Sequence, residues 1–62
     1  MFTVEFTDLH GRKYTNGARY SDKVRALDLV RYYRRILSRD GAFVTGAIPG
    51  AGIAVNVTLI AA

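Results

Sequence analysis

Hydrophobic and polar residues alternate at the start of the chain. In the opening sequence FTVEFT, the Phe, Val and Phe occupy every second position, with Thr and Glu between them. This period of two is typical of a strand with one buried face, so we expect a strand over residues 2–7. A weaker strand is expected over residues 12–19, where the turn-forming pair Asn16 and Gly17 predicts an early end near Thr15.

The pattern changes to a helical period over residues 21–39. Placed 100° apart, the apolar residues of this stretch form an arc of about half the circumference, wide enough to lie on a sheet. We expect Ser21 to cap the N-terminus of the helix and Gly41 to end it in the left-handed conformation. The side chains expected to build the core against the first strand are Leu27, Val30, Tyr33 and Leu37.

Residues 42–62 contain no charged side chain. Two interpretations compete: a membrane span that follows a basic segment, or a β-hairpin. Pro49 and three glycines interrupt the stretch, and Val, Ile and Thr are enriched on both sides of the break. These features favour a hairpin with strands over residues 42–48 and 53–60.

The hairpin leads to an expectation about which side chains face the helix. A four-residue loop pairs Ile48 with Ile53 and Val44 with Val57, and paired residues share a face of the sheet. The residues then expected toward the helix are Ile53, Val55, Val57 and Leu59. The residues expected on the opposite face are Phe43, Thr45, Asn56 and Thr58. A loop of odd length would reverse this assignment.

Together these elements predict one α+β domain over residues 1–62, with the order β(β)αββ. The expected sheet has three or four mostly antiparallel strands, and the helix packs on one of its faces. A chain of this length is near the lower limit for folding alone, and it has no cysteine to supply a disulfide. Because the last two expected strands carry no charge, their edge is poorly protected, and homodimerisation through it is a reasonable hypothesis.

The charge balance points to an anionic partner. Nine Lys and Arg residues against five Asp and Glu give a formal net charge of +4. Nucleic acid and acidic protein surfaces are partners of this kind. The N-terminus lacks the basic region and long apolar run of a secretory signal, so we expect a cytoplasmic location. The favoured hairpin argues against a membrane partner, and peripheral membrane association is a third and weaker alternative.

Residue types that carry chemistry are sparse. His10 is the single histidine, and Asp8 is its nearest carboxylate in the sequence. Two such ligands cannot close a zinc site without cysteines, and a general base needs a positioned partner. We therefore expect no catalytic residue, no metal site and no cofactor, and we expect that the protein is not an enzyme.

The candidate binding site is the polar face of the expected helix. Arg31, Arg35 and Arg39 follow one another at four-residue intervals, forming a row about 12 Å long. Arg25 and Tyr32 lie beside it. Guanidinium groups bind phosphate in a bidentate manner, and tyrosine rings stack on bases. The alternative interpretation is a solvated face that Asp28 partly neutralises.

Two further basic residues, Arg12 and Lys13, extend this surface if the first turn folds toward the helix. The leading hypothesis is a small binding protein that docks on nucleic acid, or on a complex that handles it, through the basic helix face. The alternative is a protein-protein inhibitor or adaptor of the compact kind encoded by mobile elements. It would act through the uncharged hairpin edge or the Phe43 face, possibly as a homodimer.

Overall fold

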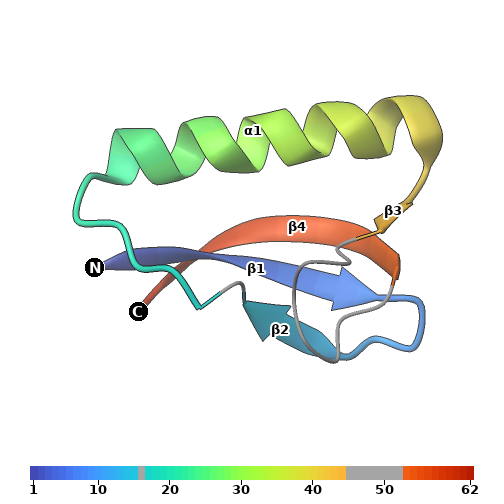
Figure 1. Cartoon of the computed structure of the whole chain (residues 1–62), viewed down its shortest axis with the longest axis horizontal. Coiled ribbons are helices and arrows are strands. Elements are labelled where there is room, and N and C mark those ends of the chain that lie inside the picture. Colours follow the sequence, from blue (N-terminus) through green and yellow to red (C-terminus); the bar gives the residue numbers. More distant parts are fainter. Residues whose placement is uncertain (16, 45–52) are drawn as a thin grey trace.

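One helix lies across one face of a four-stranded antiparallel sheet (Figure 1). The computed structural model describes residues 1–15, 17–44 and 53–62. Along the chain the elements are β1 (Phe2–Asp8), β2 (Lys13–Thr15), α1 (Lys23–Asp40), β3 (Phe43–Val44) and β4 (Ile53–Ala61). The strands lie in the order β2-β1-β4-β3, and each neighbouring pair is antiparallel. The predicted α+β class and the element order β(β)αββ are confirmed.

The central strands β1 and β4 carry the core. Val4 and Phe6 of β1 are 0% and 1% exposed, as the alternating pattern at the start of the chain predicts. Phe6 pairs with Val57 of β4, which is also fully buried. From α1, Val30 packs into the same cluster. The chain thus gains its stability from one small contact layer between the helix and two adjacent strands.

The helix begins two residues later than the sequence suggested. Asp22, not Ser21, is the N-cap: its backbone is extended, and its carboxylate accepts a hydrogen bond from the Val24 N–H at 2.9 Å. Both residue types are good caps, and the sequence offers them side by side. The helix ends as predicted, because Gly41 adopts φ of 76° and its N–H donates to the Leu37 carbonyl at 2.7 Å.

The second strand is short, as the turn signal predicted. β2 ends at Thr15, and Gly17 has a positive φ of 79°, which interrupts an extended ladder. The chain then returns to β1 at a single bridge between Phe2 and Tyr20. In between, the buried Thr3 hydroxyl donates to the Ala18 carbonyl at 2.6 Å, which holds this connection against the sheet.

The last strand contains an irregularity that alternation could not predict. Thr7 pairs with Asn56 but the next residue, Asp8, pairs with Ala54, so Val55 is an additional residue on the β4 side. A β-bulge of this kind reverses the facing of every residue beyond it. Ala54 is therefore fully buried and Ile53 is 41% exposed, whereas the sequence pattern placed Ile53 toward the helix.

The predicted position of Phe43 on the far face of the sheet is wrong for the same reason. Phe43 pairs with Ala54, which the bulge turns toward the helix. Its ring stacks on Tyr33 with centroids 5.2 Å apart, and its edge contacts Phe6 at 5.9 Å. A contact surface built around Phe43 on the far face is thereby excluded.

The predicted hairpin register is also wrong. Val44 pairs with Ile53, not with Val57. The expected strand residues 45–48 and the expected turn at 49–52 lie outside the described residues. Ile53–Ala61 is a strand of the sheet. Within the described ranges, no helix is both long and apolar enough to cross a membrane.

The turn between β1 and β2 is organised by the Asp8 carboxylate. Its Oδ1 atom accepts hydrogen bonds from the backbone N–H groups of His10 and Arg12, both at 2.8 Å. Gly11 completes the turn with φ of 81°. Desolvation raises the pKa of Asp8, but the two backbone bonds and the charges of His10 and Arg12 outweigh it, and the pKa lies below its usual 3.8.

Replacing Asp8 with alanine is expected to lower the melting temperature at neutral pH, because two backbone donors lose their acceptor. A lowered folded-state pKa gives stability that is present above the unfolded pKa and is lost as the pH falls through the folded value. The difference in unfolding free energy between the wild type and Asp8→Ala should therefore shrink below pH 3.8. Urea denaturation at pH 7 and pH 2 measures it, and an unchanged difference would contradict this role.

Candidate functional site

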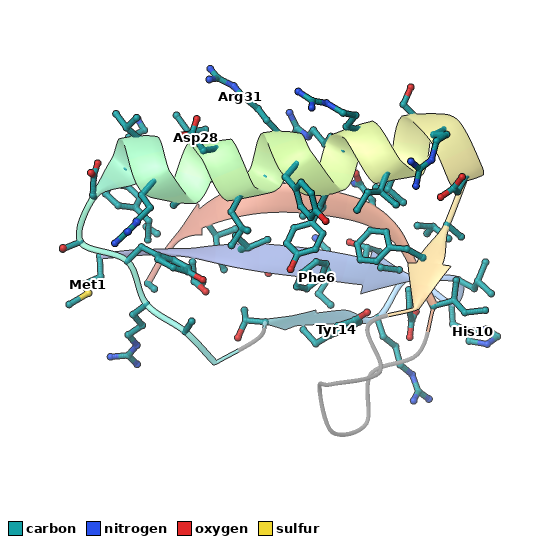
Figure 2. All side chains as sticks on the ribbon, turned by 45° about the horizontal axis from the view of Figure 1, so that its top comes forward. Met1, Phe6, His10, Tyr14, Asp28 and Arg31 are labelled. Atoms are coloured by element: carbon teal, nitrogen blue, oxygen red, sulfur yellow. The ribbon has the colours of Figure 1, made fainter. Side chains whose placement is uncertain are left out.

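The outward face of α1 carries the predicted arginine row. We call Arg31, Arg35 and Arg39 the basic row; all three are exposed. Figure 2 shows Arg31 and Asp28 on the side of the helix turned away from the sheet. The row follows from the helical period, because residues four apart lie on one face and the apolar residues occupy the other. The structure thus brings these three predicted residues together.

The three arginines differ in how strongly carboxylates hold them. Arg31 lies 3.7 Å from Asp28, and both side chains are about 70% exposed (72% and 67%), so the pair is weak. Arg39 binds Asp40 through two hydrogen bonds of 3.1 and 2.9 Å, which raise the pKa of Arg39 and lower that of Asp40. In the described part of the chain, Arg35 has no carboxylate partner.

A shallow groove of about 400 Å³ runs along one flank of the same helix. We call it the flank groove; its lining residues are Tyr20, Arg25, Asp28, Leu29 and Tyr32. Four of them occupy helix positions i, i+3, i+4 and i+7, which form one stripe. The fifth, Tyr20, is fixed by two backbone hydrogen bonds to Phe2 of 2.7 and 2.8 Å.

The flank groove brings together predicted and unpredicted residues. Arg25 and Tyr32 were expected beside the row, and the structure places them there. Tyr20 flanks the helix start in the sequence, where a tyrosine can serve either in contact or in packing, and the sequence does not show that this segment pairs with Phe2. The stripe of Arg25, Asp28, Leu29 and Tyr32 was available from the helical spacing alone.

Arg34 links the helix to the sheet. Its Nε donates to the Val57 carbonyl at 3.3 Å, so the guanidinium is directed to the β4 side of the helix. The opposite flank carries Arg25 and the groove. Arg34 therefore contributes charge near the surface but is committed to the contact between helix and sheet.

Arg12 and Lys13 are not brought together with the basic row. Both are exposed and lie where the first turn meets β2. Lys13 pairs with Thr7, one residue from the Phe6–Tyr14 pair that faces the helix. Because successive residues of a strand point to opposite faces, Lys13 belongs to the face away from the helix. The two basic groups are separate surfaces.

The carboxylate in the turn that contains His10 serves to hold the turn together. Asp8 binds backbone N–H groups, and His10 is exposed at the tip (Figure 2). Among residues 1–15, 17–44 and 53–62, no three His, Cys, Asp or Glu side chains gather in a way that could hold a metal ion.

Comparison of the chain with protein families, with curated proteins and with solved structures finds no significant match.

Proposed function

We propose that this protein is a small, non-enzymatic binding protein that docks on nucleic acid through the outward face of α1. The contact is made by the basic row, with Arg25 and Tyr32 at its side. The target is nucleic acid, either alone or within a complex that handles it.

The observation that carries the proposal is the exposed, poorly neutralised row at Arg31 and Arg35. Arg31 is 3.7 Å from its partner Asp28, and Arg35 has no carboxylate partner in the described residues. Like charges four residues apart on a helix are mildly unfavourable, so the helix gains nothing in stability from this arrangement. A phosphate backbone offers a matching row of negative charge.

Nucleic acid is favoured over an acidic protein surface by the aromatic neighbour. Tyr32 is 57% exposed, beside the arginines rather than in the core. Guanidinium groups recognise phosphate oxygens, and exposed tyrosine rings recognise the flat faces of bases. Carboxylates of an acidic protein offer no counterpart for the ring.

The proposal predicts a marked salt dependence of binding. Each neutralised phosphate contributes about −0.9 to the slope of log K against log salt concentration on duplex DNA. Two or three contacts from the basic row give a slope of roughly −2 to −3. Fluorescence anisotropy with a labelled duplex and a labelled single strand, at stepped NaCl concentrations, measures this slope. Absence of binding to both probes at low salt, or a slope near zero, would overturn the proposed function.

A further inference from the structure

We propose that the flank groove holds one unpaired base of a single-stranded nucleic acid whose phosphates lie along the basic row. This inference rests on the proposed function and specifies the form of nucleic acid that the site takes. A base suits this groove because its lining combines two tyrosines with the charged side chains of Arg25 and Asp28.

The ring of Tyr32, which would stack on the base, is supported by the aromatic residues of the core. The Tyr32 ring contacts Tyr33 edge to face, with centroids 5.5 Å apart. Tyr33 in turn stacks on Phe43 and meets Phe6 at 5.1 Å, so the chain of rings reaches the core. Burial raises the pKa of Tyr33, and the neighbouring Tyr20 and Tyr32 add to the shift. Tyr32 is therefore both exposed and supported, as a stacking residue must be.

The second tyrosine in the groove lining comes from outside the helix. Tyr20 belongs to the segment that precedes α1, and its bridge to Phe2 fixes it relative to the helix. The groove is thus lined by rings from two separate parts of the chain and by the aliphatic Leu29. A flat, mostly apolar ligand with polar edges fits such a site.

The basic row runs alongside the groove on the same helix. Arg35 follows the lining residue Tyr32 by three positions, and Arg31 follows the lining residue Asp28 by three positions, so both arginines lie next to the groove. Arg25 is itself a lining residue of the groove. A base in the groove therefore places its own phosphate and those of its neighbours near these arginines. In a duplex, stacking neighbours cover both faces of a base, and the groove cannot receive it.

The groove lining also includes a hydrogen-bond acceptor that distinguishes one base from another. Asp28 lines the groove, and its ion pair with Arg31 is long enough to leave the carboxylate available. A carboxylate only accepts hydrogen bonds, through two oxygens side by side. Guanine is the base whose Watson–Crick edge presents two adjacent N–H donors. We therefore expect guanine to be favoured in the groove.

The test compares Tyr32→Ala with Tyr32→Phe on three ten-nucleotide probes. These are an oligouridine, the same strand with one central guanine, and a duplex; DNA versions of the strands separate RNA from DNA binding. Wild type should bind the single strands better than the duplex, and the guanine strand best. Tyr32→Ala should lose about tenfold on the single strands and little on the duplex, because one base-stacking contact is removed. Tyr32→Phe keeps the ring and should retain binding.

Asp28→Asn provides the second arm, since it should remove the preference for the guanine strand over oligouridine. Circular dichroism checks that each variant is folded, as the exposure of Tyr32 leads us to expect. If Tyr32→Ala leaves the ratio of single-strand to duplex affinity unchanged, the base site is wrong while the proposed function stands. If wild type binds none of the probes at low salt, the proposed function itself fails. An unchanged guanine preference in Asp28→Asn would overturn the role of Asp28.

Discussion

Replacing Arg31 and Arg35 together with glutamate is expected to reduce the affinity for nucleic acid by about 100-fold or more. The double variant removes two charge-assisted contacts, each contributing about 1.5 kcal/mol or more, and it places negative charge against the phosphates. Both side chains are exposed and outside the core, so the fold should remain intact. Anisotropy titration at fixed salt measures the affinity, and circular dichroism checks the fold.

The chain supplies a matched control for this experiment. Arg12→Glu with Lys13→Glu makes the same change in charge, and both double variants bring the formal net charge from +4 to zero. The control residues belong to the turn and the far face of the sheet, away from the basic row. The control should lose far less affinity than the helix variant. Equal losses would show that net charge alone drives binding, and the helix face would then not be the site.

Replacing Phe6 with alanine is expected to remove a large part of the protein's stability and to lower its melting temperature sharply. Phe6 is 1% exposed and contacts the rings of Tyr14, Tyr33 and Phe43. Truncating a buried phenylalanine costs about 3–5 kcal/mol. A chain of this length has a total stability of roughly 3–9 kcal/mol, so this one side chain accounts for much of it. Thermal and urea denaturation followed by circular dichroism measure the loss.

Phe2→Ala is the matched control for the core variant. Phe2 lies at the end of the same strand, is only half-buried, and has the Lys23 ammonium 5.9 Å from its ring centroid. The same side-chain truncation there should shift the melting temperature by clearly less. If the two variants melt alike, the core is not centred on Phe6 as the structure indicates.

Local patterns in the sequence predicted the main elements because each depends on neighbouring residues. The alternation in β1, the half-apolar arc of α1 and the Gly41 stop are all set within a few positions of the chain. The N-cap was missed by one position because Ser21 and Asp22 are both suitable caps. Only the extended backbone at Asp22 and its bond to Val24 distinguish them.

What could not be predicted depends on contacts between distant segments. The bulge at Val55 forms only where β4 meets the end of β1, and it decides the facing of Ala54 and Phe43. The flank groove likewise needs Tyr20 to pair with Phe2. The basic row was predictable from helical spacing, whereas its separation from Lys13 required the register of β2.

The hydrogen bond between Arg34 and Val57 also affects the free edge of β4. The Val57 carbonyl is taken by Arg34, and the Val57 N–H is bonded to the Asn56 side chain at 2.9 Å. Beyond Ala54, no described strand pairs with this edge of β4. Unpaired edges invite strand addition and aggregation. A strand that adds to β4 at Val57 must first displace the side chains of Arg34 and Asn56 from the Val57 backbone. These two hydrogen bonds therefore oppose strand addition at an edge that carries no charged residue of its own.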